Sequence, residues 1–331
     1  MTASLVLWPR WVSPAALATS LCAAYVALLV VAKGDPLVLM TLGQRFAPAE
    51  LQSHIYSDSG YDGQFTYYLA RYGADALPLL DAPAYRAQRA LLPAIVRVLS
   101  AGQPGAIVWL LIGINLAALF AGTQWLGRLL VTRGASRWSA LGVALSVGFF
   151  GAVRMSTNET AAYSLVLGAL VLVDRARWVQ AALVFALAAI AKEPTLLCAA
   201  AIALWLLQQK KFGPAIAVAS ISVVPWLVLQ FVLHNATGSF GFGSGGENTT
   251  GFVAIPFAGL TGPIWQGLRL GQVAPMVVLA ATGRSGVLRR TGVQLVQRPR
   301  PGERPDRGRR LGSPPRRRRP GDERSGSRPR S

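Results

Sequence analysis

Residues 106–126 read AIVWLLIGINLAALFAGTQWL, an apolar run without a single charged residue. A helix needs about 20 such residues to cross the hydrocarbon core of a bilayer. The whole chain has the same character, since 52% of its 331 residues are hydrophobic and its mean hydropathy is +0.40. Only 14% are charged, against about 25% in soluble domains. The sequence therefore predicts an all-α, polytopic transmembrane helical bundle.

Other apolar runs of helical length lie on both sides of this span. They cover residues 14–31, 138–152, 160–173, 178–191, 195–207 and 212–233, with a weak last run at 275–281. Several are shorter than about 20 residues, so we expect boundaries that slip or helices that re-enter. Within the polar segment between Val31 and Ala106, the stretch Ala90–Leu99 has the apolar spacing of a short interfacial helix.

Charges at the ends of the spans predict an orientation. With a cytoplasmic N-terminus, the inward loops hold Arg128, Arg133, Arg137, Arg175, Arg177, Lys210 and Lys211, with Asp174 as their acid. The short outward loops are balanced, with Arg154 and Glu159 in one and Lys192 and Glu193 in the other. Basic inner loops are what the positive-inside rule requires. The long polar segment between the first two spans then lies outside, and its balanced charges predict an ordered, paired structure.

The C-terminal part has a different composition. Residues 284–331 contain 16 arginines and 4 acidic residues, and so contribute +12 to the net charge of +19. A segment this rich in Arg, Pro and Gly cannot form a hydrophobic core, so we expect a disordered tail after a membrane domain over 1–283. It is either a polybasic segment for anionic surfaces or a GC-rich gene read out of frame, which would truncate the domain near its eighth span. No aromatic residue alternates with its arginines, so nucleic-acid stacking is not expected.

Two common kinds of site are excluded by composition. Cys22 and Cys198 both lie inside predicted spans, which leaves neither a disulfide framework nor a zinc spacing. His54 and His234 are the only histidines, so a histidine metal cluster is excluded. A divalent metal held by acidic external loops stays compatible with the sequence.

The polar segment contains the candidate chemistry, in SGYDGQFTYY over residues 59–68. A carboxylate such as Asp62 can accept the proton of an acceptor hydroxyl during sugar transfer. The substrate-binding residues expected around it are the rings of Tyr61, Phe65, Tyr67 and Tyr68, which can stack on sugar faces, and Gln64. Since Asp-Gly is also a strong turn signal, Asp62 is equally explained as a loop residue in a turn.

Two arginines follow in DAPAYRAQR, residues 81–89. The spacing of Arg86 and Arg89 puts both on one face of a helix, where two guanidiniums can hold a phosphate. The alternative is that they pair with Asp75 or Asp81 in the same segment.

Three further charges lie at span ends on the predicted outer face. Glu159, Lys192 and Glu193 are candidates for substrate binding, because charges at such depth are costly and often functional. Glu159 equally suits the start of a helix, where carboxylates are favoured. Lys192 and Glu193 equally suit local pairing or snorkelling. The glycine-rich residues 238–246 are expected to form a flexible external loop.

These motifs carry a resemblance. The segments Tyr61–Phe65 and Pro83–Arg89, with Asn158–Thr160 and Ala191–Thr195 as weaker companions, resemble a group of bacterial polytopic proteins in the GT-C glycosyltransferase superfamily. That group is associated with the formation of cell-surface glycopolymers. The resemblance covers about residues 14–275. Members of the group continue through further spans, whereas this chain turns into the Arg/Pro tail.

The resemblance implies a GT-C fold, a polyprenyl-phosphate-linked sugar donor and a catalytic carboxylate in the first external loop, which maps onto Asp62. We therefore expect an inverting hexosyl or pentosyl transferase at the external face of the bacterial inner membrane, with a glycan or lipid acceptor and membrane lipids as partners. No cofactor is required by the sequence. The alternatives are a non-enzymatic transporter or flippase of lipid-linked sugars, which would show internal repeats that we do not see, and an inactive truncated fragment.

Overall fold

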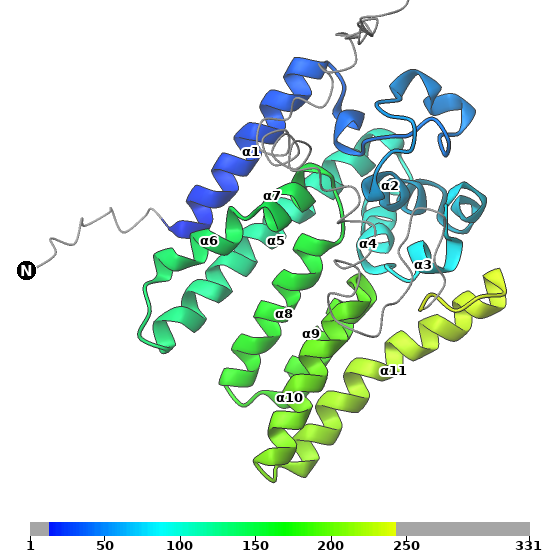
Figure 1. Ribbon diagram of the computed structural model, residues 1–331. Coiled ribbons are helices and arrows are strands. Elements are labelled where there is room, and N and C mark those ends of the chain that lie inside the picture. Colours follow the sequence, from blue (N-terminus) through cyan, green and yellow to red (C-terminus); the bar gives the residue numbers. More distant parts are fainter. Residues whose placement is uncertain (1–12, 243–331) are drawn as a thin grey trace, which may run out of the picture. The chain divides into compact units, whose positions relative to one another are not determined.

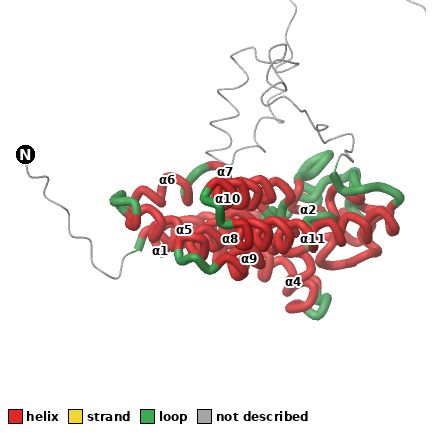
Figure 2. The backbone as a smooth tube through the Cα atoms, turned by 90° about the horizontal axis from the view of Figure 1, so that it is seen from below, coloured by secondary structure: helices red, strands yellow, loops and turns green. Residues whose placement is uncertain are grey.

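The computed structural model describes residues 13–242, which consist of helices and loops without a β-strand. One isolated bridge joins Gly43 and Ser57. In Figure 2 the described chain accordingly carries only the colours of helix and loop. The all-α prediction is confirmed for these residues. The run at 275–281, the glycine-rich residues from 243 onward and the tail over 284–331 lie outside them.

The α-helices are α1 Pro14–Lys33, α2 Asp62–Tyr72, α3 Pro83–Ala87, α4 Leu91–Ser100, α5 Pro104–Thr132, α6 Ala140–Ala144, α7 Val147–Arg154, α8 Glu159–Asp174, α9 Trp178–Ala191, α10 Leu196–Gln208 and α11 Phe212–Thr237. Short 3₁₀ turns lie at Pro36–Leu39, Ala49–His54, Gly73–Leu79, Arg137–Ser139 and Glu193–Thr195. The predicted interfacial helix at Ala90–Leu99 is α4, and the predicted run at 178–191 has the bounds of α9.

Local signals fix where the first helix begins and ends. Ser13 is in the extended conformation, and its hydroxyl accepts a hydrogen bond from the amide of Ala16 at 3.0 Å. At the other end, Gly34 has a φ of +69° and donates its amide to the carbonyl of Val30 at 2.8 Å. The left-handed residue stops the helix at a cost that only glycine avoids.

Neighbouring helices pack in a simple order. α5 packs between α1 and α8, and α9 packs between α8 and α11, which also contacts α10. Figure 1 shows α2, α3 and α4 together at one end of these helices. One apolar core is formed by α1, α5 and the segment between them, and a second by α8 to α11. The polar segment is therefore part of the packed structure.

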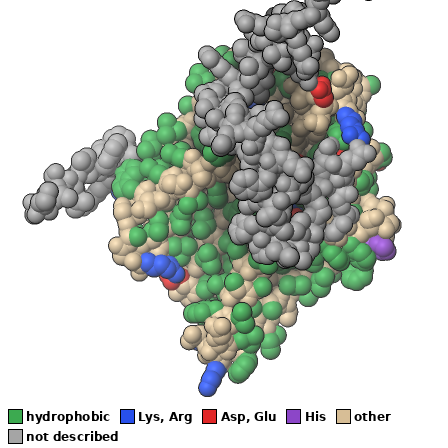
Figure 3. Space-filling model, viewed as in Figure 1, with side chains coloured by type: hydrophobic (Ala, Val, Ile, Leu, Met, Phe, Trp, Pro, Cys, Tyr) green, Lys and Arg blue, Asp and Glu red, His purple; other side chains and the backbone are tan. Residues whose placement is uncertain are grey.

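Three of the described helices are long and apolar enough to cross a membrane, namely α1, α5 and α11. α11 shows the surface expected of such a helix, because Phe212, Ile216, Phe231 and Val232 are all more than half exposed. Figure 3 shows apolar side chains over most of the visible helix surface, with the charged ones toward its edges. These features indicate association with a membrane. α8, α9 and α10 have 16, 14 and 13 residues, which is less than a straight crossing requires.

The single span predicted at 138–152 is wrong. The structure divides it into the 3₁₀ turn Arg137–Ser139 and the short helices α6 and α7. Ser146 lies between the two helices in an extended conformation, and its hydroxyl accepts a hydrogen bond from the amide of Phe149. A serine that caps a new helix competes with continuation of the old one, and hydropathy alone does not detect it.

The polar segment between α1 and α5 is ordered and internally paired, as its charge balance predicts. The carboxylate of Asp35 contacts the His54 ring at 2.7 Å, and Arg71 lies 3.8 Å from Glu50. Residues 62–68, however, are not a loop. Asp62 is the first residue of α2, a position where the helix dipole favours a carboxylate.

Close contact between α5 and α8 depends on a glycine. A Cβ on Gly122 would lie 3.2 Å from Cα of Ser164 and even closer to the Ser164 side chain. Gly113, in the same helix, has nothing within 4 Å of a Cβ. Small residues let apolar helices approach where no hydrophobic difference from lipid drives them together.

We predict that Gly122→Ala destabilises the full chain by about 1–3 kcal/mol, because backbone at the contact must shift. Gly113→Ala is the matched control, and we expect it to be neutral or to stabilise the helix by up to about 1 kcal/mol. Thermal unfolding of the detergent-solubilised protein measures both. Equal effects of the two substitutions would contradict the packing of α5 on α8.

Candidate functional site

Four segments meet at one end of the helices to form a cluster of charged side chains. Asp62 begins α2, Arg86 lies in α3, Glu159 begins α8, and Lys192 and Glu193 follow α9. Arg89 follows α3 within the same cluster. We call these six residues, together with Asp81, the charged cluster. The sequence predicted that its distant segments converge on one face, and the structure brings them together.

Asp62 lies at the centre of this cluster. Its two carboxylate oxygens contact different guanidiniums, Oδ1 at 2.9 Å from Nη1 of Arg86 and Oδ2 at 3.4 Å from Nη1 of Arg89. The Asp62 side chain is 34% exposed, while the two arginine side chains are almost fully buried. The carboxylate is therefore the solvent-facing member of a three-residue bridge.

Two further carboxylates fix the direction of the arginines. Asp81 accepts hydrogen bonds from Nε and Nη2 of Arg86 at 2.8 and 2.9 Å. Glu193 accepts from Nε and Nη2 of Arg89, both at 3.3 Å. Because the same edge of each guanidinium is occupied in this way, both Nη1 atoms are left to point at Asp62. Bidentate pairing of this kind supplies geometric precision as well as energy.

Aromatic rings complete the environment of the two guanidiniums. Arg86 lies over the ring of Phe65 at 4.6 Å, and Arg89 lies over the ring of Tyr85 at 4.5 Å. The Tyr85 hydroxyl also accepts a hydrogen bond from Nη2 of Arg89 at 2.6 Å. Each arginine is thus held by a carboxylate on one edge and by a ring on its face.

The pKa values of both arginines reflect this pairing. Burial by itself would lower the pKa of Arg86, but its hydrogen bonds to the Asp81 carboxylate and the charge of Asp62 outweigh burial and raise the pKa. Burial likewise opposes the charge on Arg89, and Glu193 outweighs it, so that its pKa is also raised. Both side chains therefore stay cationic whenever the protein is folded.

Glu159 and Lys192 form a second pair beside the first. The ammonium of Lys192 contacts Oε1 of Glu159 closely, so Lys192 pairs across helices and not with its neighbour Glu193. The other oxygen of Glu159, Oε2, is buried and accepts no hydrogen bond from the described residues. The same is true of Oδ1 of Asn158. Acceptor atoms without a donor on two adjacent residues suit a ligand that brings hydroxyl donors.

Three residues predicted to bind substrate have another role. Tyr67 and Tyr68 are 1% and 0% exposed and pack in the core, with their ring centroids 6.1 Å apart. Gln64 is also fully buried, where it accepts from the amide of Gly43 at 2.9 Å and donates to the carbonyl of Ser59 at 3.0 Å. These side chains shape the polar segment from inside and are not placed to contact a sugar.

The remaining aromatic residues of the motif divide between surface and interior. Tyr61 is 48% exposed and precedes Asp62, so it stays available to stack on a ligand. Partial burial and then the charges of Asp62 and Glu159 raise the pKa of its hydroxyl, which therefore remains a neutral donor. Phe65 is buried, and it serves as the ring beneath Arg86.

Sequence reasoning missed several members of the site. Asp81 is predicted only as an alternative partner for the arginines, Tyr85 and Asn158 are named only as members of motifs, and Thr157 is not predicted at all. Thr157 and Asn158 line a small depression with Asp62, Arg86, Arg89, Glu159, Phe65, Thr66 and Leu69. The signal for Asp81 was its position five residues before Arg86, which places it at the turn that begins α3.

The depression has a volume of only about 10 Å³, which is close to the space of one water molecule. A ligand larger than a water molecule therefore requires side chains of this lining to move. Over residues 13–242, no three carboxylate, histidine or cysteine side chains come close enough to hold a metal ion. The donor set of the depression is that of an oxyanion and hydroxyl site.

Comparison with known proteins adds no assignment. No protein-family model, curated protein or solved structure matches this chain. The functional assignment of the charged cluster therefore rests on its own geometry.

We predict that Glu193→Gln lowers the free energy of unfolding by about 1–3 kcal/mol, because it removes the main charge partner of a buried guanidinium. Asp75→Asn is the control, since Asp75 is an exposed acid that forms no ion pair with the residues between 13 and 242. Chemical denaturation of the full chain in detergent measures both. A Glu193→Gln variant no less stable than the control would contradict the pairing of Glu193 with Arg89.

Proposed function

We propose that this chain is a multi-pass membrane glycosyltransferase of the GT-C type, which moves a sugar from a polyprenyl-phosphate donor to a glycan or lipid acceptor. The observation that carries the proposal is the bridge in which Arg86 and Arg89 direct one N–H each at the carboxylate of Asp62. Such a pair is an oxyanion site that is already oriented, and Asp62 occupies it in the structure.

The phosphate of the donor takes the place of the carboxylate in this scheme. Guanidiniums bind phosphate oxygens in the same planar, hydrogen-bonded way in which they bind carboxylates. A phosphate that enters between Arg86 and Arg89 displaces Asp62 toward solvent, where its side chain is already 34% exposed. The displaced carboxylate is then free to face an acceptor hydroxyl at the moment when the donor is in place.

The reaction then follows from the positions of these groups. Asp62 accepts the proton of an acceptor hydroxyl while that oxygen forms a bond to the anomeric carbon. The bond from the anomeric carbon to the phosphate oxygen breaks, and its electron pair leaves with the polyprenyl phosphate. Arg86 and Arg89 stabilise the charge that develops on that phosphate. One displacement of this kind inverts the configuration of a hexosyl or pentosyl group.

The other residues of the cluster either contact the substrates or keep the side chains that contact them in position. Asp81 and Glu193 keep the arginines oriented, and they are positioning residues. Glu159 and Asn158 offer the two orphaned acceptor oxygens to sugar hydroxyls, and Tyr61 offers a ring at the edge of the depression. Lys192 holds Glu159 through its ion pair. The site faces the external side of the bacterial inner membrane in the orientation that the basic loops favour.

We predict that Asp62→Asn lowers transfer at least 100-fold, because the amide cannot take up the hydroxyl proton. Asp75→Asn is the matched control in the same segment, since Asp75 is exposed and does not line the depression. The assay reconstitutes the full chain in vesicles with a panel of radiolabelled hexosyl and pentosyl polyprenyl-phosphate donors and a membrane acceptor fraction. Transfer that survives in Asp62→Asn at the wild-type rate would remove Asp62 from the mechanism.

A further inference from the structure

A second cavity lies at the opposite end of the helices from the charged cluster. α8 begins at Glu159 in the cluster and ends at Asp174 in this cavity, and its 16 residues span about 24 Å. The cavity has a volume of about 390 Å³ and lies among the start of α1, the last turns of α5 and the end of α8. It is far larger than the depression at Asp62 and shares no residue with it.

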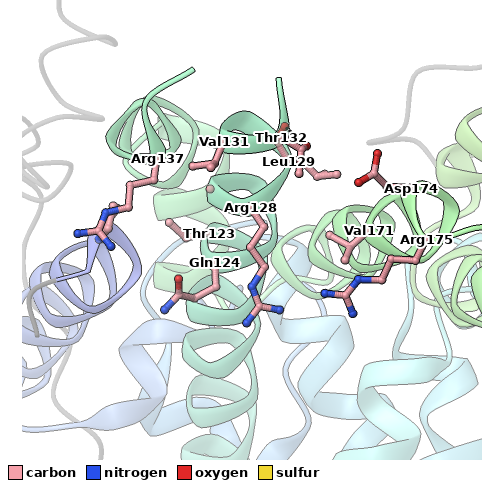
Figure 4. Close-up of a pocket in the computed structure, with 12 residues that line it drawn as sticks. Thr123, Gln124, Arg128, Leu129, Val131, Thr132, Arg137, Val171, Asp174 and Arg175 are labelled. Atoms are coloured by element: carbon pink, nitrogen blue, oxygen red, sulfur yellow. Dashed lines mark hydrogen bonds between the residues drawn. The ribbon is translucent and has the colours of Figure 1, made fainter. Parts of the chain in front are cut away.

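The charged lining of this cavity is mainly basic. Arg128, Arg137 and Arg175 face a single acid, Asp174. Neither Arg128 nor Arg175 forms an ion pair with any residue between 13 and 242. Figure 4 shows their side chains extending to the same side from α5 and from the end of α8, with Arg137 on the other side of α5. The cavity therefore presents uncompensated positive charge to a ligand.

The rest of the lining is apolar or neutral. Leu129 and Val171 are buried in its wall, and Val131 is 56% exposed. Thr123 and Gln124 supply neutral polar groups one turn deeper along α5. Both α1 and α5, whose ends form two of the walls, are long and apolar enough to cross a bilayer. A ligand for this cavity must combine an anionic head with an apolar part that continues along the helices.

We propose that this cavity binds the phosphate headgroup of an anionic phospholipid, in the leaflet opposite to the one that holds the charged cluster. Basic pockets between helix ends are favourable sites for such headgroups, since each arginine near the surface contributes to their attraction. Arg128 and Arg175 bind the phosphate, and the glycerol and the first acyl carbons lie against Leu129, Val131 and Val171. The proposal is independent of the glycosyltransferase assignment, because no residue of the charged cluster takes part.

The test measures the melting temperature of the full detergent-solubilised chain against increasing short-chain phosphatidylglycerol. We expect stabilisation that saturates, and a roughly 30-fold weaker apparent affinity in the double variant Arg128→Gln with Arg175→Gln. The matched control is Arg177→Gln with Lys210→Gln, which removes the same charge from exposed residues of the inward loops that do not line the cavity. We expect the control to lose clearly less affinity than the Arg128 and Arg175 pair, because its charges act on the lipid only from a distance.

Two results would overturn the proposal. An equal loss of affinity in the control pair would mean that the lipid responds to surface charge in general and not to the cavity. Inorganic phosphate that stabilises the protein as strongly as the lipid would mean that the anion is a free phosphate. The pair Arg128→Lys with Arg175→Lys keeps the charge, and recovery of affinity in it would show that the glutamine variant failed in binding and not in folding.

Discussion

The need to pair two buried guanidiniums constrains the rest of this structure. Arg86 and Arg89 lie close together with almost no exposed side-chain surface, and a buried cation is tolerated only when it is paired. Their acidic partners come from three separate places in the chain. Asp81 precedes α3, Asp62 begins α2, and Glu193 follows α9 more than 100 residues later. The requirement to pair these charges therefore joins the polar segment after α1 to the turn that follows α9.

The same requirement explains why the cluster is suited to chemistry. Asp81 and Glu193 satisfy one edge of each guanidinium, which leaves one N–H of each for a shared oxyanion. Asp62 fills that position and is also the member that solvent reaches. In the proposed reaction, exchange of this carboxylate for a phosphate links donor binding to release of the base. The proposal then requires only the Asp62 side chain to move when the donor binds.

Much of the fold and part of the site could be predicted from the sequence. Long apolar runs predicted α1, α5, α9 and α11 with small errors at their ends. Motifs in the polar segment predicted Asp62, Arg86 and Arg89 as site residues, and charges at span ends on the same predicted face added Glu159, Lys192 and Glu193. Burial within a motif could not be predicted. Residues 62–72 form a helix most of whose side chains are buried. Burial of two neighbours such as Tyr67 and Tyr68 does not follow from their sequence pattern.

The ion-pair partners of Lys192 and Glu193 also could not be predicted from their spacing in the sequence. Lys192 has φ −160° and ψ +120°, an extended conformation that sends successive side chains to opposite sides. Lys192 therefore meets Glu159, while Glu193 meets Arg89. The break at Ser146 had a local signal in its capping hydroxyl, yet the hydrophobic run around it concealed that signal.

The most direct test of the account is the affinity of the full chain for a polyprenyl monophosphate that carries no sugar. If the phosphate replaces the carboxylate between Arg86 and Arg89, Asp62→Asn removes a competitor. The variant should then bind this ligand at least as tightly as the wild type, whereas Arg89→Gln should bind it at least 10-fold more weakly. Loss of binding in Asp62→Asn as large as the loss in Arg89→Gln would contradict the exchange of carboxylate for phosphate.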